Sequence, residues 1–474
     1  MSTVPVTALD RARKKAYLRL LPLLFLCYVI AYVDRSNVAI AKLTMTKDLP
    51  QFDNAVIGFG AGVFFIGYFL LEIPGTLIVE KWSARKWISR IMISWGIVAA
   101  MTAWVKLPWQ FYTVRFFLGL AEAGFFPGVI VYLTHWFPSR DRARALAWFF
   151  VATPIAQVIS PKLSNALLKI GMDGHPPFLG MVGWQWVYIA WGIPAVVLGV
   201  IVLFMLTDRP GQAMWLDADE REALERELKK EKALHHGVVD EELALIGEEV
   251  EAEFGTVREK AQPSAGRKHM TVAEALSHPK VLMLAAAYFF IVTGNYGVEF
   301  FLPSILDKWY HLKLDNLTWL LILPPLGSLA GQIFVGWSSD RMHERRLHAV
   351  IPIYLGAIAL AVVALLDAPP LWLTVTLFVL AMTGLKAYLP AFWSLPSLFL
   401  TEAAAAGSIG LINSVGNLGG FLGPYMLGAI EKQTGSFNNG MLILATSMVI
   451  SASLILTLGL GKRVVEKEKV ASEV

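Results

Sequence analysis

The sequence predicts an all-α membrane protein in which twelve transmembrane helices form two pseudo-symmetric six-helix bundles. Hydrophobic residues make up 56% of its 474 residues and charged residues only 16%, which is far more apolar than an ordinary soluble domain. Apolar segments of roughly 20 residues, the length that a helix needs to cross a hydrocarbon core of about 30 Å, recur about twelve times. One long polar stretch, residues 208–278, separates the first six segments from the last six.

The apolar segments set the expected domain boundaries. They cover residues 17–40, 55–79, 87–106, 109–133, 144–168 and 184–206, then 280–305, 317–338, 349–367, 371–399, 405–430 and 438–460. We therefore expect an N-terminal bundle over 1–207, a cytoplasmic linker over 208–278, a C-terminal bundle over 279–462 and a cytoplasmic tail over 463–474. In the linker, residues 220–231 (EREALERELKKE) carry acids and bases at helical spacing, which predicts a solvated helix with i,i+4 ion pairs.

Lysine and arginine in the short loops predict the orientation. If the helices alternate in direction, the basic clusters fall on one side, which is then the cytoplasmic side with both termini and the linker. The opposite loops, such as 172–177 and 367–370, carry few cations. The formal net charge of +4 therefore reflects topology and lipid contact, and nucleic-acid binding is not expected. We expect a multi-pass protein of the inner or plasma membrane.

A short charged motif occurs once in each half. An acid, a base and a second base four residues later follow both the second and the eighth apolar segments: Glu80, Lys81 and Arg85, then Asp340, Arg341 and Arg345. The second copy stands 260 positions after the first (340 − 80). Parallel halves of this kind are typical of transporters, so we expect these residues to gate the cytoplasmic side. Charges at a membrane edge otherwise serve only as topology signals.

Four charged residues stand out among those that lie inside the apolar segments. Arg115 and Glu122 are seven residues apart, about two helical turns, so they share one helix face, and Asp34 and Arg35 lie late in the first segment. Ionised groups at membrane depth are costly unless paired or hydrated, so these side chains should line a water-filled path. The structural alternatives are a local ion pair that closes the outer end of the first helix and an interhelical bridge at Arg115 and Glu122.

The repeated loops resemble those of the major facilitator superfamily, although the first copy has Thr76 and Ser83 where that superfamily often has glycine. Within it, the chain resembles the anion:cation symporters, which are proton- or sodium-coupled carriers of organic anions. The resemblance covers nearly all of the chain outside the linker. Its segments are residues 32–35 (YVDR), 67–74 (GYFLLEIP), 115–127 (RFFLGLAEAGFFP), 294–297 (GNYG), 392–396 (FWSLP) and 412–424 (INSVGNLGGFLGP).

The resemblance implies roles for individual residues. Asp34 and Glu122 would take the coupling protons, with Arg115 as their counter-charge. Arg35 would meet the carboxylate of the substrate. The rest of the implied pocket consists of Tyr32, Tyr68, Trp393, Ser394 and Asn413. The expected coupling ion is the proton, with sodium as the alternative.

Two lysines lie inside apolar segments. Lys162 is close to the outer end of its segment, where a lysine side chain can reach the membrane interface. Lys386 is near the middle of the 371–399 segment, where reaching the interface is harder. We therefore place Lys386 in the substrate pocket, where a second cation suits a substrate with a second acidic group.

The expected function is proton-coupled import of a small organic anion by alternating access, with the lipid bilayer as environment and a monomer as the working unit. Sugar acids, tartrate-like hydroxydiacids and aromatic acids remain open as substrates. The alternatives are an anion exchanger and a non-transporting sensor with a carrier fold, although the linker is short and charged for a signalling domain. The sequence has no metal-ligand spacing, cofactor motif or catalytic set, so neither a metal, a cofactor nor an enzyme is expected.

Overall fold

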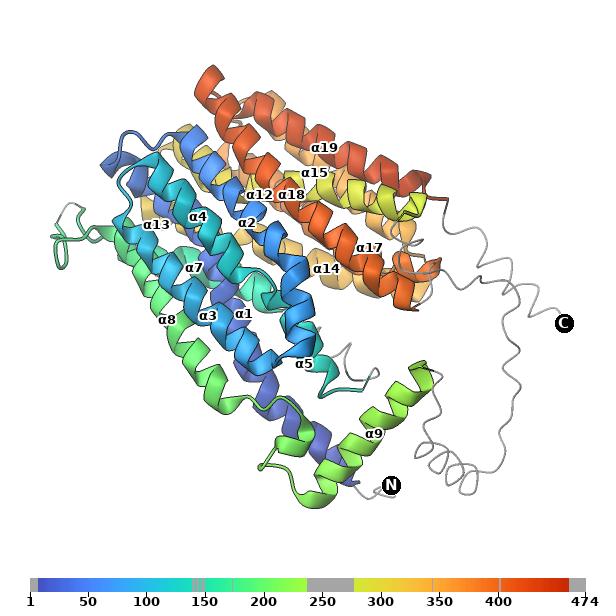
Figure 1. The fold of residues 1–474 in the computed structure, drawn as a ribbon. Coiled ribbons are helices and arrows are strands. Elements are labelled where there is room, and N and C mark those ends of the chain that lie inside the picture. Colours follow the sequence, from blue (N-terminus) through green and yellow to red (C-terminus); the bar gives the residue numbers. More distant parts are fainter. Residues whose placement is uncertain are drawn as a thin grey trace, which may run out of the picture.

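The fold is known from a computed structural model, which describes residues 7–138, 141, 145, 149, 151–172, 174–236, 277–342, 344–399 and 402–459. The described residues form helices joined by short connections, with one isolated bridge between Phe178 and Met181. Most of the helices run roughly alongside one another in two groups (Figure 1). Nine helices or helix pairs among the described residues are long and apolar enough to cross a membrane.

The helices divide into two sets around the linker helix α9 (Ala218–His236). The N-terminal set is α1 (Ala8–Asp48), α2 (Asn54–Lys81), α3 (Ala84–Met101), α4 (Pro108–Glu122), α5 (Phe125–Thr134), α7 (Ala152–Leu168) and α8 (Gly183–Met205). The C-terminal set is α12 (Pro279–Tyr310), α13 (Leu314–Leu320), α14 (Leu323–Met342), α15 (Arg346–Leu366), α16 (Leu371–Ala387), α17 (Leu389–Phe392), α18 (Glu402–Thr434) and α19 (Asn438–Thr457).

The same packing pattern occurs in both sets. In the N-terminal bundle α1 packs on α7 and α8, α2 on α4, and α3 on α8. In the C-terminal bundle α12 packs on α18 and α19, α14 on α16, and α15 on α19. Each contact in one bundle joins helices of the same rank as its counterpart in the other, which confirms the predicted pseudo-symmetric major facilitator fold. The bundles meet where α2 packs along α18, α1 against α12, and α7 against α13 and α14.

The predicted span 109–133 is two helices in the structure. It breaks between α4 and α5 at Gly124, whose φ of 83° lies in the left-handed region that favours glycine. A Cβ atom at Gly124 would also lie 3.1 Å from the indole nitrogen of Trp87. The break leaves Glu122 as the last residue of α4, so this carboxylate stands at a helix end inside the bundle.

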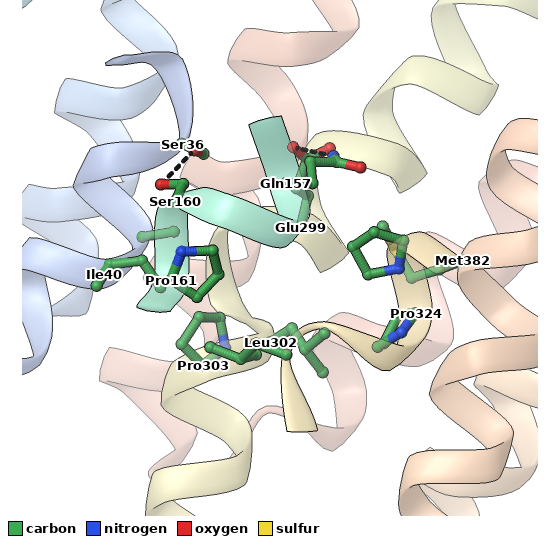
Figure 2. A pocket seen from close by; sticks show the side chains of 13 residues that line it. Ser36, Ile40, Gln157, Ser160, Pro161, Glu299, Leu302, Pro303, Pro324 and Met382 are labelled. Carbon is green, nitrogen blue, oxygen red and sulfur yellow. Dashed lines mark hydrogen bonds between the residues drawn. The ribbon is translucent and has the colours of Figure 1, made fainter. Parts of the chain in front are cut away.

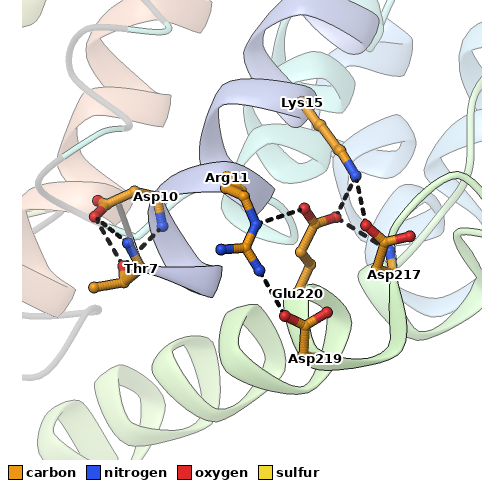
Figure 3. A network of polar contacts seen from close by, with 7 residues as sticks. All are labelled: Thr7, Asp10, Arg11, Lys15, Asp217, Asp219 and Glu220. Carbon is orange, nitrogen blue, oxygen red and sulfur yellow. Dashed lines mark hydrogen bonds and ion pairs between the residues drawn. The ribbon is translucent and has the colours of Figure 1, made fainter. Parts of the chain in front are cut away.

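The linker helix α9 is less solvated than the sequence predicts. One side forms the expected i,i+4 pair, with Arg226 and Glu222 at 2.9 Å. The other side docks on the start of α1, where Lys15 lies 2.7 Å from the carboxylate of Glu220. Figure 3 shows the contact between Lys15 and Glu220, together with that between Arg11 and Asp219. The linker therefore begins as an extension of the N-terminal bundle.

Two ion pairs join the bundles at the helix ends that the loop charges predict to be outside. Lys432 of α18 lies 2.9 Å from Asp53, which precedes α2. Lys169, which follows α7, lies 2.8 Å from Asp315 of α13. We call these contacts the outer rim pairs. They hold the two bundles together on this side.

Candidate functional site

A buried ion pair joins α1 to α4 inside the N-terminal bundle. Arg35 Nε donates to Glu122 Oε1 at 2.5 Å, and the Glu122 side chain is fully buried. The Arg35 guanidinium also lies 5.2 Å from the ring centre of Tyr68, a cation–π contact. Sequence analysis had assigned Arg35 to the substrate and Arg115 to the carboxylates. In the structure, Arg35 is the direct partner of Glu122.

Arg115 lies close to this pair without joining it. Its Nε donates to the backbone oxygen of Gly60 at 3.4 Å, and its guanidinium lies 5.0 Å from the ring centre of Phe64. It interacts with Asp34 and Glu122 through space. In the part of the chain that the structure describes, both terminal nitrogens of Arg115 lack a hydrogen-bond partner. Arg115 therefore supplies a nearby positive charge rather than a salt bridge.

Asp34 is a buried carboxylate held by neutral donors. Its Oδ2 accepts from the indole nitrogen of Trp95 on α3 at 2.7 Å, and its Oδ1 accepts from Asn37 at 3.4 Å. The structure does not contain the alternative ion pair between Asp34 and Arg35 at the outer end of the first helix, because Arg35 pairs with Glu122.

A second buried ion pair lies where the two bundles meet. Lys386 Nζ of α16 lies 3.3 Å from Glu299 Oε2 of α12 and 3.2 Å from the hydroxyl of Tyr32 on α1. Gln157 Nε2 of α7 donates to the other oxygen of Glu299 at 2.8 Å. Lys386 therefore reaches the interior of the protein and not the membrane interface.

Sequence reasoning missed Glu299. The signal was present, since Glu299 is an acid inside the apolar segment 280–305 and stands two residues after the GNYG motif at 294–297. An intramembrane acid is a candidate functional residue by default. The sequence gave no partner for Glu299, because Lys386 lies 87 positions further along the chain.

A third polar cluster joins α2 to α18. Glu72 accepts from Asn413 Nδ2 at 2.6 Å, from Ser414 Oγ at 3.1 Å and from Asn417 Nδ2 at 3.4 Å. Asn413 was expected in the pocket, and in the structure it points across the bundle interface to a buried carboxylate. Glu72 belongs to the 67–74 segment, which sequence analysis quoted without giving this residue a role.

Figure 2 shows a cavity that lies between the bundles. Helices α1 and α7 form one wall, and α12, α14 and α16 form the other. Its polar lining consists of Ser36, Gln157, Ser160 and Glu299. The Glu299 side chain lies against Gln157 at the edge of the cavity, and Ser36 is hydrogen-bonded to Ser160 (Figure 2). The Lys386–Glu299 pair therefore borders this space.

The remaining expected pocket residues differ in their surroundings. Tyr68 is buried beside Arg35. Trp393 is half-buried, with its ring 5.0 Å from that of Tyr288 and edge-on to it. Ser394 donates to the backbone oxygen of Ala391 at 2.7 Å, so this hydroxyl bonds to its own helical turn.

The first charged loop, residues 80–85, contacts the end of its own bundle. Arg85 lies 3.8 Å from the carboxylate of Asp208, which also accepts from the backbone nitrogen of Arg85 at 2.9 Å. The side chains of Glu80 and Lys81 lie outside the described part of the structure, so their gating role stays a prediction.

The second charged loop shows the same local pairing. Arg345 lies 2.5 Å from Asp340 and donates to Ser339 Oγ at 3.0 Å. Arg341 lies over the ring of Trp337 at 5.4 Å. In this conformation, these contacts hold the loop against its own bundle.

The sequence matches the profile of the Major Facilitator Superfamily over residues 24–424. The chain belongs to this superfamily and is a multi-pass membrane transporter, not an enzyme. A protein of Agrobacterium vitis named as a candidate tartrate transporter is 39% identical over 94% of each chain. The inner membrane transport protein RhmT of Escherichia coli is 33% identical over 97% of this chain and 98% of its own. A candidate metabolite transport protein of Pseudomonas putida, NicT, is 35% identical over 93% of this chain and 92% of its own.

Solved structures with low sequence identity share the fold. A bacterial homologue of the human lysosomal transporter Spinster, in an inward-facing and occupied conformation, gives a TM-score of 0.68 at 16% identity and covers 96% of this chain and 97% of its own. The xylose transporter XylE of E. coli, in a partially occluded inward open conformation, gives 0.66 at 13% identity and covers 94% of this chain and 100% of its own. These similarities support the architecture and say nothing about the substrate.

Proposed function

We propose that this transporter imports a small organic anion together with protons, through alternating access. The observation that carries the proposal is the buried Arg35–Glu122 pair, at 2.5 Å. An arginine whose charge is already neutralised by a carboxylate cannot also hold a substrate carboxylate at full strength. Proton loading and anion binding are therefore linked at one pair of side chains.

The linkage follows from charge balance. Protonation of Glu122 removes its negative charge and leaves the Arg35 guanidinium free to bind a carboxylate through two parallel hydrogen bonds. The proton and the anion then enter together, and the site carries the same net charge before and after loading. Because an unbalanced charge at membrane depth is costly, each ligand favours the binding of the other.

The surrounding residues support this assignment. Tyr68 stacks on Arg35 and would keep the guanidinium in place when Glu122 is protonated. Arg115 lies close enough to Asp34 and Glu122 to interact with both, and it would favour the return of each carboxylate to its ionised form. Such a group can load protons on one side and release them on the other.

Alternating access is supported by the asymmetry of the contacts. The outer rim pairs join the two bundles, whereas the loop pairs Arg85–Asp208 and Asp340–Arg345 lie within one bundle. This pattern is that of a carrier closed on its outer side. The names of the relatives support an organic anion, and tartrate is the first substrate to test.

An anion exchanger with the same site is the second candidate. The Arg35–Glu122 pair speaks against obligatory exchange, because ionised Glu122 neutralises Arg35 in the empty carrier and so gives it a neutral way back. A sensor without turnover is less well supported, since the 208–278 linker is short and charged for a signalling domain.

Uptake into proteoliposomes separates these candidates. Purified protein is reconstituted and given labelled tartrate, a sugar acid or an aromatic acid, with and without an acid-outside pH gradient. Accumulation above the external concentration, abolished by a protonophore, is the expected result for at least one acid. Uptake that occurs only when an internal anion has been preloaded would support the exchanger. Binding of the acid without uptake would support the sensor.

A further inference from the structure

Proton coupling at Arg35 and Glu122 does not involve the second buried ion pair, Lys386–Glu299. We infer that Glu299 is a second proton-loading group, which releases Lys386 for the second acidic group of a diacid. The inference rests on the proposed function. It assigns the site to dicarboxylates and predicts one more proton per diacid than per monoacid.

The geometry repeats that of the first pair. Lys386 and Glu299 are 10% and 14% exposed, and they lie 3.3 Å apart at the edge of the cavity between the bundles. In the first pair the cation is likewise the partner of a buried carboxylate. Protonation of either carboxylate leaves a cation that lacks its counter-charge and is ready to bind an anion.

The groups that face Glu299 come from every helix packed around it. Lys386 of α16 is its cationic partner, Gln157 of α7 and Asn295 of α12 donate to it, and Tyr32 and Tyr296 interact with it electrostatically. The amides and the tyrosines are neutral near pH 7. Lys386 is thus the charge that balances Glu299 in this setting.

The two cations are close enough to serve one ligand. Lys386 contacts the hydroxyl of Tyr32 at 3.2 Å, and Tyr32 and Arg35 are three positions apart on α1, where side chains are neighbours. One cation belongs to the N-terminal bundle and the other to the C-terminal bundle. A diacid that bridges them would hold the bundles together around itself.

The charges balance for each class of substrate. A monoanion needs one freed cation, so Glu122 takes a proton and the Lys386–Glu299 pair stays closed. A dianion needs both cations, so Glu299 takes a further proton. In both cases the loaded site has the net charge of the empty one, which avoids an unbalanced charge in the membrane.

The test compares tartrate with its monoamide, which has nearly the same size and one carboxylate fewer. Accumulation in proteoliposomes is measured at several imposed pH gradients, with the membrane potential clamped at zero. Each coupled proton gives about a tenfold rise in accumulation per pH unit. The logarithmic slope for tartrate should exceed that for the monoamide by one in the wild type.

Glu299→Gln should abolish this difference, since the amide takes no proton. Tartrate uptake by the variant should then be opposed by an inside-negative potential, while uptake of the monoamide keeps its wild-type slope. Glu222→Gln, on the exposed face of α9, is the matched control for the loss of a carboxylate. The charge-neutral double variant Glu299→Gln with Lys386→Gln should likewise lose the additional slope for tartrate.

The outcomes distinguish a failure of the role of Glu299 from a failure of the proposed function. Equal slopes for the two acids in the wild type, or an unchanged difference in Glu299→Gln, overturn the role of Glu299 and leave the proposed function intact. If neither acid accumulates under any pH gradient, the proposed function fails for these substrates, and the inference fails with it.

Discussion

Two groups of ion pairs in this transporter, those of the interior and those of the outer rim, differ in burial. The interior pairs, Arg35–Glu122 and Lys386–Glu299, have carboxylates that are 0% and 14% exposed. At the outer rim, Asp315 is 61% exposed and its partner Lys169 is 41% exposed. Water and salt screen the rim pairs, so they are individually weak. Breaking an interior pair leaves a charge in a low dielectric, where it must find a proton or an anion.

The difference in burial suggests different roles for the interior pairs and the rim pairs. Interior pairs change partner when a proton or an anion arrives, so they are suited to coupling. Rim pairs are easily broken and re-formed, so they are suited to setting how long the outer side stays closed. The predictions below separate these roles, beginning with the interior.

Loss of the titrating group at Glu122 should have the largest effect. Glu122→Gln keeps the shape of the side chain, but an amide takes no proton. With tartrate monoamide and the membrane potential clamped at zero, a pH gradient of one unit should drive about tenfold accumulation in the wild type and about onefold in the variant, while exchange of labelled for unlabelled monoamide persists. Asp34→Asn should behave in the same way, and normal accumulation in Glu122→Gln would return Glu122 to a structural role.

Arg35→Lys tests the partner of Glu122. Lysine keeps the charge but loses the planar fork that binds a carboxylate through two hydrogen bonds. The affinity for every anionic substrate should fall about tenfold or more, measured by isothermal titration calorimetry in detergent. An effect limited to diacids would contradict the assignment.

Lys386→Ala should have a selective effect. The competition by a diacid against labelled substrate should weaken about tenfold, whereas that by a monoacid of similar size should change little. An unchanged ratio of the two potencies would make Lys386 a structural residue and favour monoanions as substrates.

The rim should show the smallest effect. Asp315→Asn removes one outer rim pair, and the population of outward-open carriers should rise by about two- to fivefold. The readout is the labelling rate, from the outer side, of a single cysteine placed at Ser160 in a Cys27→Ser background. Asp367→Asn, whose carboxylate accepts from Asn438 within the C-terminal bundle on the same side, serves as the control.

The rim and the interior should also differ in their response to pH. Burial raises the pKa of Asp53, but its hydrogen bonds, that from Lys432 foremost, together outweigh this effect and hold that pKa below its ordinary value of 3.8. Such a carboxylate contributes its full stabilisation of the ion pair at any pH above its ordinary pKa. It loses this stabilisation only as the pH falls through the lowered pKa. Outer closure should therefore be constant between about pH 5 and 8, while coupled uptake changes with pH. A pH-dependent labelling rate in this window, without substrate, would contradict the separation.

The sequence predicted the architecture well and the pairing poorly. Helix positions follow from runs of apolar residues, which are local, so most spans agree with the helices to within a few residues. The exceptions are 17–40, which belongs to a longer helix, and 317–338 and 371–399, each of which is divided between two helices. The break at Gly124 was missed because a left-handed glycine leaves no gap in the apolar run. Glu122 and Arg35 were both identified as site residues, but their contact depends on how α1 and α4 pack, which local patterns do not encode. Glu299 could have been found as an acid inside an apolar segment, but its pairing with Lys386 could not.

The most direct test of the coupling claim measures protons during binding. Purified transporter in a lightly buffered solution near pH 7 is mixed with tartrate monoamide, and the proton change is followed with an indicator dye. We expect proton uptake on binding in the wild type and a loss of this uptake in Glu122→Gln, with the anion still bound. Binding of the anion without proton uptake in the wild type, or with the same uptake in the variant, would contradict the exchange of partners at Arg35.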